Sequence, residues 1–211
     1  MGHYGSGKTF TAVNYAVYLS TLGKKVSIYD LDIVNPYFRT VDAEKFLAKN
    51  DVELIVSPYA ETNVDIPAMN AKSYRMIHDK TQYAVLDIGG DERGALALGR
   101  FYEEILKEND YNAFWVVNPY RIETRTVKDA IALKDEIENT ARIKFTQIVN
   151  CANLGDETTP ETVMNGLKFC EELSGKTGLP IAFSAVRCDI AEKMKIKDVL
   201  AVKPIKYGDW L

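Results

Sequence analysis

The segment Gly2–Thr9, GHYGSGKT, restricts the fold of this chain more than any other, because it fits the pattern G-x-x-x-x-G-K-[ST]. In that pattern a glycine-rich loop leads directly into a helix, and backbone N–H groups converge on phosphate oxygens. A helical pattern follows at once, from Lys8 to about Leu22, with Val13 and Val17 available for a buried face. The segment therefore predicts a phosphate-binding loop at the start of a helix.

Apolar strands alternate with amphipathic helices along the rest of the chain. We expect strands at 26–30, 52–56, 83–88, 112–117, 145–149 and 180–185, and helices at 41–49, 67–78, 94–108, 124–141, 160–174 and 190–195. This alternation is typical of a parallel sheet that helices cover on both faces. Because no repeat, low-complexity tract or linker divides the sequence, we expect one domain over residues 1–211.

Composition narrows the class of protein. The net charge of −4 provides no general attraction to nucleic acid or to anionic membranes. The 3 cysteines are never spaced C-x-x-C, which argues against a disulfide framework or a zinc site and fits a reducing cytosol. No signal peptide is visible, and no apolar run approaches the ~20 residues that span a bilayer. We therefore expect a cytoplasmic protein that binds neither nucleic acid nor membrane.

One segment near the carboxyl end has some features of a membrane contact. Residues Lys193–Leu200 mix lysines with apolar residues, as an interfacial helix does. Asp198 reduces the positive charge of the segment, and Pro204 follows soon after it. We favour a structural role for this segment.

The side chains of the opening loop have distinct expected roles. Lys8 would neutralise the β and γ phosphates of a nucleotide, and the Thr9 hydroxyl would bind Mg²⁺. The loop residues expected to contact the nucleotide are Gly2, Tyr4, Gly5, Ser6, Gly7, Lys8, Thr9 and Phe10.

Acidic residues end two of the expected strands. Asp30 ends the strand 26–30 and Asp32 follows it, and Asp87 lies at the end of the strand 83–88, before Gly89 and Gly90. Ligands bind beyond the carboxyl ends of strands in open α/β sheets, so all three carboxylates are candidates. One of the first pair would orient the attacking water while the other supports the metal, and Asp87 would hold Mg²⁺ through water. Solvated turn aspartates and an ordinary strand exit are the alternatives.

The later strands end in loops that should border the same crevice. Asn150 is a candidate to read a base through its amide, and Arg187 is a candidate to stack on the base. A turn-forming asparagine and a surface arginine are the alternatives. The segment 150–153, NCAN, lacks the aspartate of the guanine-reading pattern Asn-Lys-x-Asp, so adenine is favoured.

Together, GHYGSGKT at 2–9, Asp-Leu-Asp at 30–32 and Leu-Asp-Ile-Gly-Gly at 86–90 resemble the MinD/ParA/CobQ nucleotide-binding family. The resemblance implies a P-loop NTPase fold, a three-layer αβα sandwich with a mainly parallel sheet, and it implies ATP and Mg²⁺ as cofactors. It also implies catalytic roles for Lys8 and Asp32, with Asp32 tied to the attacking water. The metal residues that it implies are Thr9 and Asp87, and Asp30 joins them as the other member of the acidic pair at the end of the first strand.

The sequence departs from the family at two places. MinD- and ParA-type members carry a signature lysine at the second loop position, which reaches across a nucleotide-sandwiched dimer, and here that position is His3. The family's loop also follows a central strand, whereas only Met1 precedes the loop here. Removing a central strand exposes backbone groups on two neighbouring strands. We therefore expect that another segment replaces it or that the protein starts upstream of Met1, and we favour the upstream start.

Three functions follow as hypotheses. The first is an ATP-binding, Mg-dependent ATPase that signals its nucleotide state to an unidentified protein partner, with a homodimer as one form. The second is a small-molecule kinase or CobQ-like ligase, whose substrate pocket would use residues 37–39, Tyr59, Tyr120 and Arg121. The third is a nucleotide-binding module without turnover. Phosphate release with and without candidate acceptors would distinguish them.

Overall fold

The computed structural model describes residues 1–31, 39–56, 75, 77–89, 92–99 and 101–203. The strands are β1 (Val26–Leu31), β2 (Val52–Val56), β3 (Tyr83–Ile88), β4 (Phe114–Val117), β5 (Gln147–Asn150), β6 (Ile181–Arg187) and β7 (Val199–Val202). The α-helices are α1 (Lys8–Thr21), α2 (Glu44–Lys49), α4 (Glu92–Gly99), α5 (Tyr102–Glu108), α6 (Val127–Ala141), α7 (Pro160–Thr177) and α8 (Cys188–Ala191). The predicted alternation of strands and helices is confirmed.

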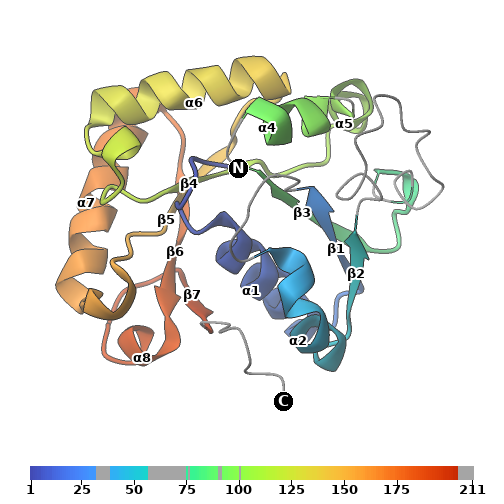
Figure 1. Ribbon diagram of the computed structural model, residues 1–211, viewed down its shortest axis with the longest axis horizontal. Coiled ribbons are helices and arrows are strands. Elements are labelled where there is room, and N and C mark those ends of the chain that lie inside the picture. The colour runs from blue at the N-terminus through green and yellow to red at the C-terminus, as the bar shows by residue number, and fades with distance from the viewer. Residues whose placement is uncertain (32–38, 57–74, 76, 90–91, 100, 204–211) are drawn as a thin grey trace.

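The strands form two parallel sheets, with orders β2-β1-β3 and β4-β5-β6-β7 (Figure 1). Every residue of β1 is buried, because β1 lies between β2 and β3 and carries helices on both faces. In β3, Asp87 is in register with Asp30 of β1. The pairing therefore brings two acidic residues together at the carboxyl ends of neighbouring strands.

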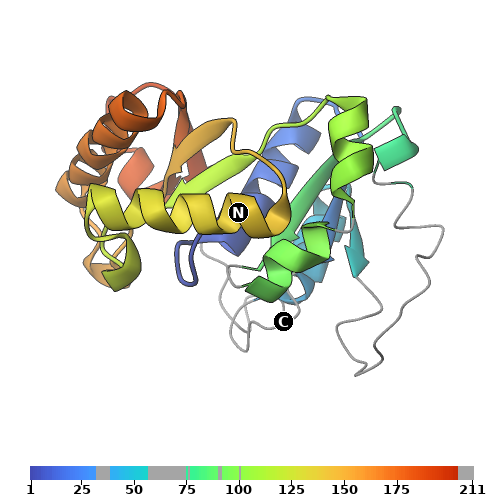
Figure 2. The same ribbon diagram turned by 90° about the horizontal axis from the view of Figure 1, so that it is seen from above.

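Helices lie on both sides of the sheets. α1 packs on β1 and β3 of one sheet and on β7 of the other, so this helix bridges the two. α4 and α6 pack against each other on the opposite side, where α7 continues the layer over β5 and β6 (Figures 1 and 2). The result is the layered arrangement that the sequence predicts.

Met1 forms a single parallel rung on β4. Its amine donates to the Phe114 carbonyl over 2.9 Å, and its carbonyl accepts from the Val116 N–H over 2.8 Å. In the described part of the chain, this rung is the only hydrogen-bonded piece of a strand between β3 and β4. The loop at Gly2 therefore starts from the edge of the four-stranded sheet.

Two expected elements differ in the structure. The expected helix 94–108 is divided into α4, which ends at Gly99, and α5, because glycine is a poor helix former. The segment Lys193–Leu200 is not one helix, because its last two residues begin the edge strand β7 (Val199–Val202), which agrees with a structural role. Most of the expected helix 67–78 lies outside the described residues. None of the described helices is long and apolar enough to cross a membrane.

Candidate functional site

Gly7 shapes the start of α1. It adopts φ 89°, and a Cβ at this position would lie 2.5 Å from the Sγ of the buried Cys151, so only glycine fits. The first helical bond runs from the Thr11 N–H to the Gly7 carbonyl, and no side chain caps the helix. The amides of the first turn therefore face a space that suits an anion.

The loop is held closely against β4. A Cβ at Gly2 would lie 2.3 Å from the Val116 carbonyl oxygen, so a larger residue would push the loop off the strand. The Ser6 N–H donates to the His3 carbonyl over 3.1 Å. The Ser6 hydroxyl is buried and has no hydrogen-bond partner among the described residues. A buried hydroxyl of this kind indicates a ligand contact, because unsatisfied polar groups are costly.

Lys8 and Thr9 lie where the pattern predicts them, in the first turn of α1. Both side chains are buried, and the Lys8 ammonium donates to the His3 carbonyl of the loop itself over 3.0 Å. The ammonium therefore lies against the loop.

Asp30 and Asp87 form a buried acidic pair at the ends of β1 and β3. Each residue is 1% exposed. Arg39 Nη2 lies 3.2 Å from Asp30 Oδ2, and the Thr40 hydroxyl donates to Asp87 Oδ2 over 2.7 Å. Both partners come from the short segment that precedes α2. The sequence did not predict these contacts, because no local pattern links residues 39 and 40 to the strand ends.

The donor set fits magnesium. Mg²⁺ typically binds proteins through one or two carboxylates together with phosphate oxygens and waters. Asp30, Asp87 and the Thr9 hydroxyl supply oxygens of this kind, whereas no cluster of three or more His, Cys, Asp or Glu side chains occurs in the described ranges. Asp32, Gly90, Tyr37, Phe38 and Tyr59 lie outside those ranges.

The segment that follows β4 contacts the Gly2–Thr9 loop. Arg121 Nε donates to the Gly5 carbonyl over 2.9 Å, and His3 Nδ1 lies 3.6 Å from Glu123 Oε2. Sequence reasoning assigned Arg121 to a possible substrate pocket but did not predict its contact with the loop. The structure thus adds a second cation to the edge of the loop, and it pairs His3 with a carboxylate.

Asn150 is completely buried at the end of β5. Its amide nitrogen donates to the Val163 carbonyl and to the Ser184 hydroxyl, each over 3.1 Å. Its amide oxygen accepts from the Ala152 N–H over 3.1 Å. These bonds use the amide to join β5, β6 and α7, so reading a base through Asn150 would require breaking them. The role of Asn150 as a base contact stays a prediction.

Arg187 ends β6 in an ion pair. Its guanidinium donates to both carboxylate oxygens of Asp189, over 2.8 and 2.6 Å, and to the Gly155 carbonyl over 3.0 Å. These bonds to Arg187 hold the pKa of Asp189 below its usual range. The arginine is thus held at the rim of the sheet by its own neighbours, and its stacking on a base stays a prediction.

Comparisons with known proteins agree with this geometry. A family model described as the CobQ/CobB/MinD/ParA nucleotide-binding domain, CbiA, matches residues 3–155. No curated protein matches the chain.

Solved structures resemble the chain in fold. FtsY from Mycoplasma mycoides superposes with a TM-score of 0.59 at 16% identity, over 88% of this chain and 58% of that one. The cell division protein FtsY from Thermotoga maritima gives 0.58 at 15% identity, over 88% and 60%. A nucleotide-binding protein from Archaeoglobus fulgidus, solved with ADP, gives 0.50 at 17% identity, over 91% and 82%. The chain thus spans about three fifths of these FtsY chains, and the expected α/β fold of P-loop NTPase type is confirmed.

Proposed function

We propose that this chain, which belongs to the CobQ/CobB/MinD/ParA nucleotide-binding family, binds ATP with Mg²⁺ and hydrolyses it as a switch for a protein partner. One observation carries this proposal. The first turn of α1 holds the buried Lys8, and α1 packs on β1 and β3, whose in-register Asp30 and Asp87 are also buried. A phosphate cradle beside two buried carboxylates suits a metal–nucleotide complex better than a free anion.

The residues of the loop would act on the phosphates. The Lys8 ammonium would leave the His3 carbonyl and bind the β and γ phosphates, while the uncapped amides of α1 bind their oxygens. The buried Ser6 hydroxyl would donate to a phosphate oxygen. Among these groups only the Lys8 side chain would have to move, so binding would require little reorganisation of the backbone.

Thr9, Asp30 and Asp87 would hold the metal. When bound, Mg²⁺ neutralises charge on the β and γ phosphate oxygens. Asp32, one position beyond the end of β1, would orient the attacking water. We retain Lys8 and Asp32 as the proposed catalytic residues.

The switch would operate through Arg39 and Thr40. Both side chains bond to the carboxylates that the metal needs, so metal binding and these contacts compete for the same oxygens. Release of Arg39 and Thr40 would free the segment before α2 to contact a partner. This exchange couples the nucleotide site to a surface segment.

Two features support adenine. The segment 150–153 lacks the guanine-reading aspartate, and the Archaeoglobus fulgidus protein of similar fold was solved with ADP. We propose that the base lies against the loops after β5 and β6. Asn150 would shape these loops from beneath, and Arg187 would border the base.

Calorimetric titration with Mg-ATP, Mg-GTP and metal-free ATP tests this function. We expect Mg-ATP to bind most tightly, and we expect Lys8→Ala to weaken binding about a hundredfold, a loss of about 2.7 kcal/mol. Lys49→Ala, at the end of α2, is the matched control and should bind normally. Equal binding by Lys8→Ala and the control would refute the proposal, and tighter binding of Mg-GTP would overturn the choice of base.

Arg121 favours a second candidate function, a small-molecule kinase or ligase. Its Nε contacts the Gly5 carbonyl while the residue remains exposed at the edge of the loop. An exposed cation at that edge could hold an anionic acceptor beside the γ phosphate. Phosphate release that accelerates only with added acceptors would favour this candidate over the switch.

A further inference from the structure

Arg39 contacts the acidic pair with only part of its hydrogen-bonding capacity. Its Nη2 lies 3.2 Å from Asp30 Oδ2, and its side chain is 20% exposed. Its Nε is buried and has no hydrogen-bond partner among the described residues. A guanidinium N–H that has lost water without gaining an acceptor is costly. The contact with Asp30 therefore leaves a buried donor of Arg39 available for a further acceptor.

The backbone of Arg39 is fixed independently of its guanidinium. Arg39 directly precedes the short 3₁₀ helix η1 (Thr40–Ala43). Its N–H donates to Asp42 Oδ2 over 2.8 Å, and its carbonyl accepts from the Asp42 N–H over 3.0 Å. Neither bond uses the guanidinium. The side chain can therefore exchange partners by rotation about its own bonds while η1 stays folded.

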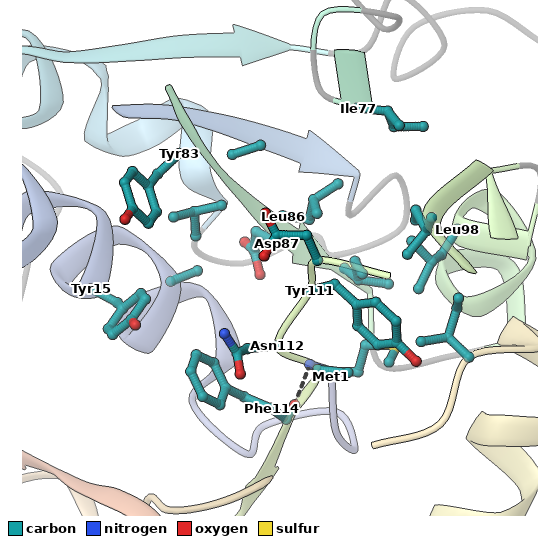
Figure 3. A pocket seen from close by; sticks show the side chains of 18 of the residues that line it. Met1, Tyr15, Ile77, Tyr83, Leu86, Asp87, Leu98, Tyr111, Asn112 and Phe114 are labelled. Atoms are coloured by element: carbon teal, nitrogen blue, oxygen red, sulfur yellow. Dashed lines mark hydrogen bonds between the residues drawn. The ribbon is translucent and has the colours of Figure 1, made fainter. Parts of the chain in front are cut away.

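Asp30 and Asp87 lie on the face of the sheet that α1 covers. Side chains alternate along a strand, so Asp30 shares its face with Ile28, and Asp87 shares its face with Val85. Ile28 belongs to a hydrophobic cluster with Val13 of α1, and Val85 packs against that cluster. Figure 3 shows Asp87 at the carboxyl end of β3, beside a cavity that lies between β3 and β4. Both carboxylates therefore belong to the α1 side of the sheet.

The short helix η1 lies on the same side. It packs on both α1 and β1, and Thr40 within it is completely buried. α1 begins at the carboxyl ends of the strands, because its other end leads directly into the start of β1. Phosphates bound at Lys8 would therefore lie on the same side of the sheet as the acidic pair, near the residue that precedes η1.

The charge around Arg39 would differ between a triphosphate and a diphosphate. Once Asp30 binds a metal ion, the guanidinium has lost its acceptor and lies beside a like charge, which is unfavourable. A γ phosphate would supply acceptors there, and a guanidinium binds phosphate through two parallel N–H bonds. A diphosphate has no γ oxygens to offer. Arg39 would therefore favour its contact with Asp30 in the diphosphate state.

We propose that Arg39 distinguishes a nucleoside triphosphate from a diphosphate: it pairs with Asp30 in the ligand-free and diphosphate states, and its guanidinium binds the γ phosphate in the triphosphate state. This inference rests on the proposed function, and it names the group that detects the nucleotide state. The exchange of partners also gives η1 a different attachment in each state, because Arg39 joins η1 to β1 only while it contacts Asp30.

Calorimetric titration of Arg39→Gln with Mg-ADP and with the magnesium complex of a non-hydrolysable ATP analogue tests the proposal. The ratio of the two affinities measures the preference for the triphosphate. We expect Arg39→Gln to lower this ratio about tenfold or more, because a charge-assisted contact to the γ phosphate is lost. Binding of Mg-ADP should be unchanged or tighter, because Asp30 is no longer paired with Arg39.

Arg75→Gln is the matched control. Arg75 also pairs through Nη2 with a carboxylate, Glu53 Oε2, over 3.1 Å, but this pair is exposed at β2. The control should leave both affinities unchanged. Equal weakening of both nucleotides by Arg39→Gln would make Arg39 a structural residue, and equal tightening would make it only a competitor for Asp30. Either result would overturn the proposal.

Arg39→Lys tests whether the fork of the guanidinium is needed. Lysine keeps the charge and can still pair with Asp30, but it cannot make two parallel bonds to a phosphate. The preference of Arg39→Lys for the triphosphate should therefore lie between those of wild type and Arg39→Gln. Full restoration by lysine would overturn the two-bond contact.

Phosphorus NMR of the bound analogue locates the contact. Arg39→Gln should shift the resonance of the γ phosphorus and leave that of the α phosphorus in place. Unchanged γ resonances, or equal shifts at every phosphorus, would refute a direct contact. If the wild-type chain bound neither nucleotide, the proposed function itself would be refuted, and this inference would fall with it.

Discussion

The carboxyl ends of the strands carry polar residues in both sheets, but the two sheets hold them differently. In the three-stranded sheet, the buried Asp30 and Asp87 are contacted by Arg39 and Thr40, two side chains of one short segment. In the four-stranded sheet, Asn150 bonds to the main chain of residues 152 and 163 and to a neighbouring strand. These contacts to Asp30 and Asp87 come from side chains, whereas two of the three bonds of Asn150 are made to the main chain.

This difference separates residues that can bind a ligand from residues that stabilise the fold. A side-chain contact to a carboxylate can be exchanged for a metal without moving a strand. A bond that joins α7 to β5 cannot be broken without loosening both elements. We infer that the same topological position serves ligand binding in one sheet and stability in the other.

The largest expected effect concerns the Met1 amine, which bonds to the edge of β4 that faces the three-stranded sheet. For the chain that begins at Met1, the unfolded amine has an ordinary pKa of 8.0, and burial lowers the pKa of the folded one to about 5. The stability that depends on this amine is therefore fully present above pH 8 and falls toward pH 5, because in this range the unfolded state binds the proton and the folded state does not. The loss reaches about 4 kcal/mol at most. Urea unfolding across this range should reveal it, and an N-acetylated chain should lack this component. Identical pH profiles for the two chains would contradict the prediction.

Asn150→Ala tests whether the polar residue at the end of β5 stabilises the four-stranded sheet. It removes three buried hydrogen bonds of the Asn150 amide and should lower the free energy of unfolding by about 3 kcal/mol. Asn112→Ala removes an exposed bond to Gln147 and should cost well under about 1 kcal/mol. Denaturant titration measures both. Unchanged stability with lost nucleotide affinity would instead make Asn150 a base contact and erase the difference between the sheets.

Asp87→Asn tests the assignment of ligand binding to the three-stranded sheet. Removal of the charge should reduce the gain in ATP affinity that Mg²⁺ provides by about tenfold, or about 1.4 kcal/mol, while metal-free ATP binds at least as well. Glu53→Gln, an exposed acid on β2 paired with Arg75, should leave that gain intact. Titrations with and without Mg²⁺ measure the gain. Equal gains in the two variants would remove Asp87 from the metal site.

Thr40→Val probes the exchangeable contact itself and should have the smallest effect. Loss of its bond to Asp87 should lower the stability of the ligand-free chain by about 1 kcal/mol. The difference from wild type should shrink with saturating Mg-ATP, because the metal then replaces the hydroxyl. Thr21→Val, at the exposed end of α1, controls for the loss of a hydroxyl. A difference that is unaffected by Mg-ATP would make the Thr40 contact purely structural.

The sequence by itself determined the elements whose signals are local. The glycine pattern predicted the loop and the start of α1, and the buried Lys8 and Thr9 lie in the first turn as expected. Alternation of apolar strands with helices predicted the parallel α/β fold. It also placed Asp30 and Asp87 at the carboxyl ends of β1 and β3. These features depend on spacing along the chain, which a sequence displays directly.

Only the tertiary structure decided which groups face one another. The bonds of Asn150, the contacts of Arg39 and Thr40 with the acidic pair, and the reach of Arg121 to Gly5 all join segments that no local period connects. The cavity between β3 and β4 is a further case, because those two strands and the helix α1 all contribute residues to its lining. Hydrogen-bond partners and cavities depend on how distant elements pack, and that packing is a property of the whole fold.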